Sequence, residues 1–416
     1  DPDVPLPDLP VAIEKLFAEK NWSINSSQGL RLTDQGRYMM EHVLNTGVTV
    51  SYRPMLARME ELLFGDCEKV FCRDANGLEQ HVDRSLNITG SGFQHHKFFA
   101  DMDRVILDIF NQPLDEQPNY IADMGCGDGS WLKRIFRLIE MQSQRGRYLD
   151  DYPLLMIGVD YNRTSVEATR KTLEEATIPC LVLEGNILEP EIMVRDLREF
   201  GINDPENILH VRSFLDHNRP FVMPKRLDEA RKRLALPLNT PFTAPDGGTI
   251  PAFLMMQNLV EHMERWAAVL VIHNLLAVEV HSMLPQWVAR FMDQSENFHF
   301  DAYHTFSGQY LLETRFFFMA AAEAGLFPDH FVGYPGTLPF TRVSLTTFEK
   351  RDYTIRHPMS DDLKELSELE KLCWNHALPT DTSVLAERIH RYSEGQFVLS
   401  YQGRIAGVMY TQRLSE

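Results

Sequence analysis

The stretch Ile121-Ala122-Asp123-Met124-Gly125-Cys126-Gly127-Asp128-Gly129 decides how this chain folds. An apolar, strand-like segment leads directly into three glycines at alternate positions, and Ser130-Trp131 then opens a helix-like segment. Glycine lets the backbone turn sharply and come close to a ligand. The first turn of a helix presents free N–H groups and a partial positive charge. The stretch therefore predicts a strand–turn–helix unit that binds a nucleotide-type ligand.

The chain on either side of this turn alternates between strand-like and helix-like segments. Apolar, strand-like runs occur at residues 120–124, 154–160, 180–184, 207–212 and 275–280. Helix-like runs separate them at residues 131–141, 165–176 and 259–273, and a long insertion covers about 217–258. This alternation predicts an α/β fold with a Rossmann-like core, expected at residues 116–345, whose sheet is mostly parallel. Ligands of such sheets bind beyond the carboxyl ends of the strands.

The residues before this core are mostly helix-like, and we expect residues 1–115 to form a helical lid. Within the lid, residues 65–91 are polar and rich in turn formers. Gly90-Ser91-Gly92 then precedes His95-His96 and a helix. We expect a loop at these glycines, which either closes over the ligand or is an ordinary connection.

The pattern changes again near residue 346. A strand-like run at 353–356 is followed by a helix ending near Trp374, and residues 397–410 read as a hairpin turning at Gln402-Gly403. We therefore expect a partial α+β domain at residues 346–416. Because the chain begins with an aspartate instead of a methionine, we also expect it to be part of a longer protein.

Further residues are in register with the glycine turn. Asp160 ends the second strand-like run, where a carboxylate can accept hydrogen bonds from both hydroxyls of a ribose. Asn186 follows the third run, where an adenine ring would lie. The nicotinamide fingerprint Gly-x-Gly-x-x-Gly is not matched, although a dinucleotide site or a purely structural turn stays an alternative. An acid just before the turn, here Asp123, is typical of methyltransferases, in which it reaches the methionine amino group.

We therefore expect S-adenosylmethionine as the cofactor. The residues expected to bind it are Asp123, Gly125, Cys126, Gly127, Gly129, Asp160, Tyr161, Asn186, Ile187 and Ser213.

Polar side chains also gather where the later strands end. Asp216 and His217 follow the fourth strand-like run, His281 follows the fifth, and His304 and Gln309 lie on a segment expected at the same edge. One interpretation is acid–base chemistry, in which a histidine deprotonates the methyl acceptor. The other is a metal site with mixed nitrogen and oxygen ligands. No spacing such as His-x3-His supports the metal, and each histidine could instead be a hydrogen-bonded core residue.

Composition excludes several classes of function. The 416-residue chain has a formal net charge of −18, which argues against binding to nucleic acid or to an anionic membrane surface. No apolar run is long enough to span a bilayer, and no signal peptide is recognisable. The cysteines are odd in number and scattered, as in a reduced compartment, so we expect a cytoplasmic protein.

The insertion is locally basic. It contains Arg219, Lys225, Arg226, Arg231, Lys232 and Arg233 with few acids. On so acidic a protein, this segment could steer an acidic partner towards the site. The alternative is an ordinary solvated helix face.

Taken together, the glycine turn and the segments at residues 212–219, 276–281 and 303–310 resemble the methyltransferase domains of polyketide synthase loading modules. The resemblance covers about residues 10–345. From about residue 350, the chain resembles the opening β-α-α-β-β of the GNAT-like decarboxylase domain that follows in such modules. This second part stops before the segment in which that fold builds its pyrophosphate-binding loop.

The resemblance implies C-methylation of a malonyl group carried as a thioester on an acyl carrier protein. It also implies a mononuclear iron (or manganese) ion and an adjoining GNAT-like domain as partner. Ligand roles carried over from the family fall on Asp216, His281, His304 and Gln309, with His217 as a replacement for Asp216. Acid–base roles would fall on the same histidines and on Asp216. Two competing hypotheses are a metal-free small-molecule O-methyltransferase and a non-catalytic scaffold that docks a carrier protein.

Overall fold

The computed structural model describes residues 9–26, 29–74, 79–236, 240, 242–292, 294, 296–337, 340–374 and 379–413. The chain divides into two compact units, residues 1–99 and residues 100–416. Among the described helices, none is both long and apolar enough to cross a membrane.

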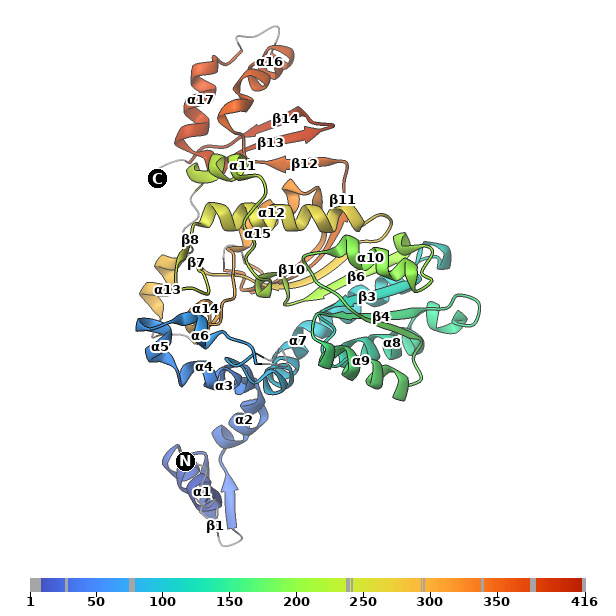
Figure 1. Cartoon of the computed structure of the whole chain (residues 1–416), viewed down its shortest axis with the longest axis vertical. Helices are drawn as coiled ribbons and strands as arrows, with labels where there is room; N and C mark the ends of the chain where they lie inside the picture. The colour runs from blue at the N-terminus through green and yellow to red at the C-terminus, as the bar shows by residue number, and fades with distance from the viewer. Residues whose placement is uncertain are drawn as a thin grey trace. The chain divides into compact units, whose positions relative to one another are not determined.

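The first unit is helical apart from one β-hairpin (Figure 1). Strands β1 (Ser23–Ser26) and β2 (Gly29–Leu32) pair antiparallel, and the sequence did not predict them. The helices are α1 (Leu9–Glu19), α2 (Asp34–His42), α3 (Gly47–Ser51), α4 (Arg53–Leu56), α5 (Met59–Phe64), α6 (Cys67–Val70) and the start of α7 (Arg84–Phe110). Helix α2 begins as expected at Thr33, whose hydroxyl accepts the N–H of Gly36 at 3.0 Å.

The loop predicted at Gly90-Ser91-Gly92 is wrong, because these residues lie inside α7. A Cβ atom on Gly90 would lie 2.5 Å from the backbone nitrogen of Val48 and 2.9 Å from Cα of Gly47. The glycine is therefore required by the close approach of α7 and α3. From sequence alone, a glycine that permits close helix packing looks like one that permits a turn.

The second unit is built on a seven-stranded sheet with the order β10-β11-β9-β6-β3-β4-β5. Five strands are parallel: β3 (Tyr120–Met124), β4 (Leu155–Asp160), β5 (Cys180–Glu184), β6 (Ile208–Ser213) and β9 (Leu275–Val280). All five coincide with the predicted runs, so the mostly parallel α/β core is confirmed. The strand order reverses at β3, which lies between β4 and β6, and this places the ligand crevice at the end of β3.

Helices cover both faces of this sheet (Figure 1). On one face lie α8 (Ser130–Gln142) and α9 (Arg163–Glu175). On the other lie α10 (Pro190–Glu199), α12 (Ala252–Val269) and α15 (Thr314–Glu323). Every residue of β9 is buried, as expected for a strand covered on both sides. Trp266 of α12 is fully buried in the core between α10 and the sheet.

The sheet extends further along the chain than predicted. Strands β10 (Leu326–Tyr334) and β11 (Val343–Lys350) add an antiparallel edge beside β9. The sheet therefore continues to Lys350, past the domain boundary expected after residue 345. β10 was missed because it contains Pro328 and Gly333, which usually interrupt strands. Pro328 is tolerated here because β10 is an edge strand with a register shift between residues 328 and 330.

The insertion contains short elements of its own. They are α11 (Leu227–Lys232) and the hairpin of β7 (Phe242–Thr243) and β8 (Thr249–Ile250). α12 begins at Ala252, directly after Pro251, and ends at Val269, so the helix lies several residues earlier than predicted. After β9, α13 (Pro285–Phe291) and α14 (Glu296–Phe306) precede α15.

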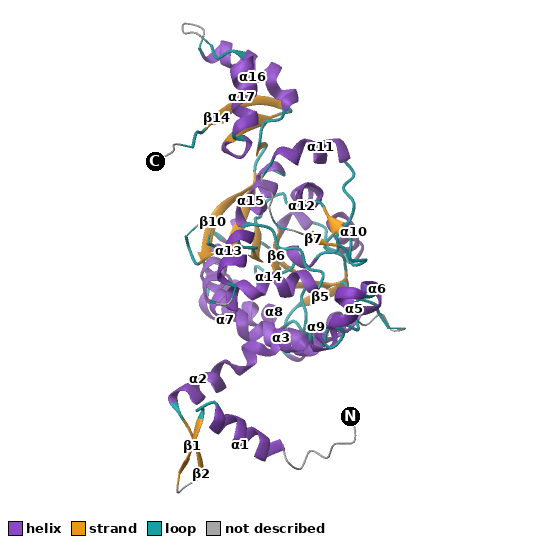
Figure 2. Ribbon diagram, turned by 90° about the vertical axis from the view of Figure 1, so that its left-hand side faces the viewer, coloured by secondary structure: helices purple, strands orange, loops and turns teal. Residues whose placement is uncertain are grey.

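The C-terminal part has the expected element order, and its helices lie beside its strands (Figure 2). Strand β12 (Tyr353–Arg356) is followed by α16 (Leu363–Cys373), α17 (Thr382–Arg391), β13 (Gln396–Tyr401) and β14 (Arg404–Tyr410). The three strands form an antiparallel sheet, and the hairpin turns at Gln402-Gly403 as predicted. The assignment of this part to the GNAT-like fold stays a prediction.

A buried ion pair joins the insertion to α15. The guanidinium of Arg233 contacts both carboxylate oxygens of Glu323 at 2.8 and 2.5 Å, and the two side chains are 4% and 5% exposed. We expect Glu323→Gln to lower the free energy of unfolding by about 3–5 kcal/mol, because it leaves a buried guanidinium without its counter-charge. Urea denaturation would measure this.

The matched control is Asp228→Asn, which removes the partner of Arg231 in an exposed pair on the same segment. It should change the free energy of unfolding by less than about 1 kcal/mol. Equal effects of the two substitutions would contradict the structural role given to Arg233 and Glu323.

Candidate functional site

The glycine turn after β3 has the geometry that its sequence requires. Gly125, Gly127 and Gly129 have φ angles of +82°, +58° and +75°, which residues with a side chain rarely adopt. A Cβ atom on Gly129 would also lie 3.0 Å from Cα of Thr169 on α9. The N–H groups of Gly125 and Cys126 donate to the Val159 carbonyl at 2.7 and 3.1 Å. The turn is thus fixed against the end of β4.

Asp160, the last residue of β4, holds this turn from the other side. Its Oδ2 accepts the N–H of Gly127 at 3.2 Å, and its Oδ1 accepts the N–H of Asn162 at 2.9 Å. The carboxylate therefore lies beside the turn, where the sequence predicts that the ribose of the cofactor binds. Tyr161 follows it and is 52% exposed, as a residue covering a ligand would be.

Two predicted residues lie beneath the turn. Asp123 is buried, and burial followed by the nearby charge of Asp160 raises its pKa well above the usual value. A bound ammonium group would oppose this shift by supplying positive charge. Burial, with Asp123 next in importance, raises the pKa of the Cys126 thiol, to which the Thr169 hydroxyl donates at 3.3 Å. Cys126 is therefore not a reactive thiol, and its predicted contact with the cofactor stays a prediction.

The other predicted cofactor residues lie on neighbouring strand ends. Asn186 is exposed after β5, and its Oδ1 accepts the N–H of Leu188 at 3.0 Å. The carbonyl of Ile187 accepts the indole N–H of Trp266 at 3.0 Å. The hydroxyl of Ser213 is buried and has no hydrogen-bond partner among the described residues. These positions agree with a ligand lying along the ends of β3, β4 and β6, although which residues touch it stays a prediction.

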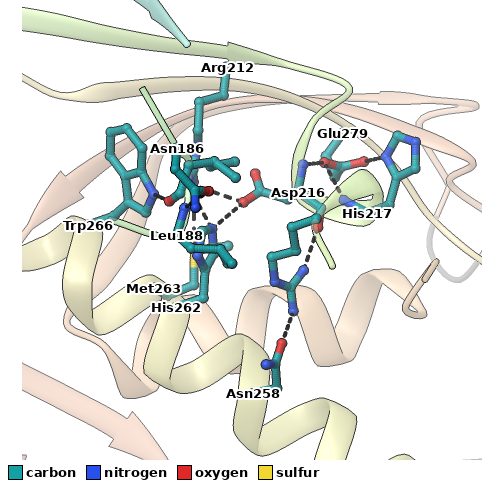
Figure 3. Close-up of polar contacts among 12 residues, drawn as sticks. Asn186, Leu188, Arg212, Asp216, His217, Asn258, His262, Met263, Trp266 and Glu279 are labelled. Carbon is teal, nitrogen blue, oxygen red and sulfur yellow. Dashed lines mark hydrogen bonds and ion pairs between the residues drawn. The ribbon is translucent and has the colours of Figure 1, made fainter. Parts of the chain in front are cut away.

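A buried charged cluster lies at the end of β6 (Figure 3). Oδ1 of Asp216 lies 3.1 Å from Nη1 of Arg212 and 2.9 Å from Nε2 of His262. Burial alone would raise the pKa of Asp216, but Arg212 and then His262 hold it below its usual value. The guanidinium of Arg212 also lies 4.6 Å from the ring centre of Trp266. Asp216 is thus a fixed anion among its neighbours.

Glu279 organises the turn that carries Asp216 and His217. Its Oε2 accepts the backbone N–H groups of these two residues at 2.7 and 3.3 Å. Its Oε1 is hydrogen-bonded to Nδ1 of His217 (Figure 3). Glu279 was not among the site residues predicted from the sequence. The signal was there, because a carboxylate in the otherwise apolar run Leu275–Val280 is seldom buried without a specific partner.

His217 and His304 are brought together. Their ring centres lie 5.3 Å apart in an edge-to-face arrangement. Gln309 is beside them, because its backbone N–H donates to the His304 carbonyl at 2.8 Å and its Nε2 donates to Oδ1 of Asn218 at 3.1 Å. Tyr310 donates its N–H to the His217 carbonyl at 2.8 Å. The segments after β6 and after α14 therefore converge as the sequence predicted.

His281 lies deeper, at the end of β9. Its ring is fully buried, its Nε2 is hydrogen-bonded to the Ser344 hydroxyl at 2.8 Å, and Phe317 packs against it. Burial, and then the charge of His217, lower the pKa of His281 to about 3. Its Nδ1 makes no hydrogen bond of normal geometry in the described part of the chain, but the backbone of Leu312 lies close enough to raise the pKa of the ring. His281 is therefore a neutral imidazole.

The predicted ligands have the types of donor atom that an iron or manganese ion accepts. Imidazole nitrogens and an amide oxygen are ligands that iron and manganese accept, and the ring of His281 is buried near His217. The carboxylate of Asp216, however, is held by Arg212 and His262. Within the described ranges, no group of three or more His, Cys, Asp or Glu side chains is arranged so that it could hold a metal ion. The ligand set stays a prediction.

The basic residues of the insertion are mostly neutralised by local acids. Arg226 pairs with Glu261 and Glu264, and Arg233 with Glu323. Arg231 pairs with Asp228, and Lys232 pairs with Asp361. Arg219 is buried and donates to Asn258 at 2.8 Å. Of the six residues, Lys225 alone has no side-chain bond recorded among the described residues, so the predicted steering surface is not supported.

Comparison with known protein families decides the assignment. Residues 79–346, well over half of the chain, match the model of the AprA MT2-like methyltransferase domain. The chain belongs to this family. It is an S-adenosylmethionine-dependent methyltransferase, as the turn and Asp160 predicted. Residues 7–66 of this AprA MT2-like protein match a second model, the AprA winged helix domain. A search of curated proteins found no significant match.

Solved structures resemble the AprA MT2-like chain only weakly. An O-methyltransferase family protein from Burkholderia thailandensis is 14% identical, covers 82% of this chain and 83% of its own, and has a TM-score of 0.42. CalO1, a methyltransferase in calicheamicin biosynthesis, is 17% identical, covers 83% of this chain and 84% of its own, and has a TM-score of 0.41. The CurJ carbon methyltransferase is 10% identical, covers 83% of this chain and 81% of its own, and has a TM-score of 0.40. At this level of likeness, the family match and the geometry carry the assignment.

Asp160 provides a direct test of the cofactor half of the site. We expect Asp160→Asn to weaken S-adenosylmethionine binding about ten- to a hundredfold, because it removes a charged acceptor of hydrogen bonds. Calorimetric titration would measure the affinity. The control is Glu184→Gln, an exposed residue directly opposite Asp160 on β5, which should bind normally. Equal affinities for the two variants would contradict the assignment.

Buried neutral histidines predict a loss of stability in acid. Burial, and then Arg212, lower the pKa of His210 from 6.5 to about 3 in the folded chain. Between these values the unfolded chain binds a proton at this ring and the folded chain does not. The contribution is therefore complete above about pH 6.5 and is lost at about 1.4 kcal/mol per unit as the pH falls.

We expect His210→Phe, which keeps a ring against Trp266, to make the acid dependence of the unfolding free energy shallower. Urea denaturation at several pH values between about 6 and 4 would show this. His390→Gln changes an exposed histidine and should leave the slope unaltered. A slope unchanged in the His210 variant would contradict the prediction.

Proposed function

We propose that this protein transfers a methyl group from S-adenosylmethionine to the central carbon of a malonyl group. The malonyl group is carried as a thioester on an acyl carrier protein, and an iron or manganese ion assists the reaction. The observation that carries the proposal is the buried cluster beside the cofactor turn, in which Glu279 holds His217 opposite His304. Methylation at carbon needs a carbanion or enolate, whereas methylation at oxygen or nitrogen needs much less activation of the acceptor.

The chemistry requires that a carbon acid lose a proton. When bound, a metal ion would polarise the two carbonyl groups of the malonyl thioester and make its central carbon more acidic. Its proposed ligands are Asp216, His281, His304 and Gln309, the set that the family resemblance implies. Glu279 occupies Nδ1 of His217, so the other ring nitrogen is the one that accepts the proton from the central carbon. The resulting carbanion then attacks the methyl carbon of the sulfonium, whose bond to sulfur breaks as S-adenosylhomocysteine leaves with the electron pair.

The residues of the cofactor turn would position the methyl donor beside the acceptor. The turn fixed by Val159 and Asp160 lies at the end of β3, and His217 lies just beyond the end of β6, the neighbouring strand. Adjacent strand ends are suited to holding donor and acceptor in line, which is the larger part of what the protein must supply. We also propose a GNAT-like domain beginning near residue 350 as the adjoining partner, supported by the β-α-α-β-β order of its elements.

The test is methyl transfer to malonyl-loaded carrier protein, followed by intact-protein mass spectrometry. We expect the carrier to gain the mass of one methylene or more when S-adenosylmethionine and iron or manganese are present. After stringent chelation the gain should disappear, and it should return when the metal is restored. Full activity after chelation would remove the metal from the proposal. Lack of any methylation with every metal supplied would remove the malonyl carrier substrate.

The paired His217 and Glu279 also favour a second candidate, metal-free O-methylation of a small hydroxyl compound. A histidine held by a carboxylate is a competent general base without any ion. Metal-independent methylation of a free hydroxyl substrate, lost in the His217→Ala variant, would support this candidate over the first.

A further inference from the structure

The loop that leads from the site to α11 carries an exposed apolar surface. We call residues 219–227 the apolar loop. Phe221 packs against the core of the second unit, and Pro224 is buried. Between them, Val222 and Met223 are 51% and 56% exposed. Single exposed apolar side chains are common, but two adjacent ones on a loop of this kind form a small surface that a partner can cover.

Hydrogen bonds to α12 hold the apolar loop at both ends. The guanidinium of Arg219 donates to Oδ1 of Asn258 at 2.8 Å, and Nδ2 of Asn258 donates to the Val222 carbonyl at 2.6 Å. The carboxylate of Glu261 accepts the two backbone N–H groups that follow Pro224, both at 2.9 Å. A partner that covers the exposed side chains therefore has little further chain to order, which keeps the entropic cost of binding small.

The apolar loop lies at the same edge of the sheet as the reaction centre. Val222 follows His217 by five residues, so their Cα atoms are at most about 17 Å apart. Asn258, which holds the loop, is in the first half of α12, and this helix leads to the start of β9 at the opposite edge. The prosthetic arm of an acyl carrier protein is of similar length. A carrier protein bound at the loop would thus place its thioester at His217.

Area and charge favour a transiently bound acidic protein over a second copy of the chain. Val222, Met223 and Leu227 are each about half exposed, far less surface than the roughly 800 Å² that each partner contributes to a stable interface. Lys225 lies among them, is exposed, and makes no side-chain hydrogen bond or ion pair within the described part of the chain. A two-fold dimer centred on the loop would bring two such lysines together, whereas an acidic partner would pair with this one.

We propose that the apolar loop is the docking site of an acidic acyl carrier protein that bears the malonyl thioester. This inference rests on the proposed function, which supplies the carrier, and adds the surface to which that carrier binds. Val222 and Met223 contact apolar side chains of the carrier, and Lys225 pairs with one of its carboxylates. The loop thereby contributes to the affinity for the carrier and not to the methyl transfer itself.

Two substrates separate docking from chemistry. Malonyl-loaded carrier protein needs the docking site, whereas malonyl-N-acetylcysteamine presents the same thioester without a carrier. With iron supplied, we expect Met223→Glu to raise KM for the loaded carrier about tenfold or more and to leave kcat unchanged. Its kinetics with the small thioester should equal those of the wild-type protein. Lys225→Glu should act in the same direction, and its effect should shrink as salt is added.

The matched control is Val271→Glu. It places a carboxylate at an apolar position that is 66% exposed and lies just before β9, at the edge of the sheet opposite the site. Both substrates should be methylated normally by this variant. Equal losses with the two substrates in the loop variants would overturn the docking site. So would a wild-type dimer in sedimentation that Met223→Glu dissolves, because the loop would then bind a second copy.

The docking site and the proposed function fail in different ways. If the wild-type protein methylates both substrates and the two loop variants keep its KM for the loaded carrier, the docking site alone is wrong. If the wild-type protein methylates neither substrate with metal supplied, the proposed function is wrong, and the loop has no carrier to bind.

Discussion

The carboxylate of Glu279 is the interaction on which the rest of the site depends. It lies on a wholly buried strand, yet it accepts hydrogen bonds from three backbone N–H groups and is bonded to the ring of His217, which lies just beyond the end of β6. A buried anion is costly unless its oxygens are all occupied, and here they are. Glu279 therefore joins the ends of β6 and β9 and fixes the direction in which His217 points.

The charged side chains around Glu279 are also paired with one another. Arg212 offsets the negative charge of Asp216, and Trp266 covers the guanidinium on its other side. Burial lowers the pKa values of His262 and His281 to about 3, so both rings are neutral. A neutral imidazole keeps a lone pair, which a metal ligand requires. His281 is thus in the protonation state that the proposed metal site needs.

The sequence predicted the features that depend on neighbouring residues and missed those that depend on contacts between residues far apart in the chain. The five parallel strands were predicted because each is a continuous apolar run, and the cofactor turn because its glycines and Asp160 have local meanings. Local patterns failed where tertiary contacts decide the outcome. Gly90 serves helix packing and not a loop, and β10 carries a proline that only an edge strand accepts. The bonding of Glu279 to His217 spans 62 residues, which no local motif encodes.

The place where β11 ends has a practical consequence. Composition changes near residue 346, but β11 pairs with β9 from Val343 through Phe348. A fragment cut at residue 345 would strip β9 of half its partner and expose the hydrogen-bonding edge of a strand that is apolar on both faces. Such an edge recruits strands from other molecules. Fragments that end at this change in composition would therefore aggregate, whereas those that keep the whole of β11 would present β10 as the natural, bulged border.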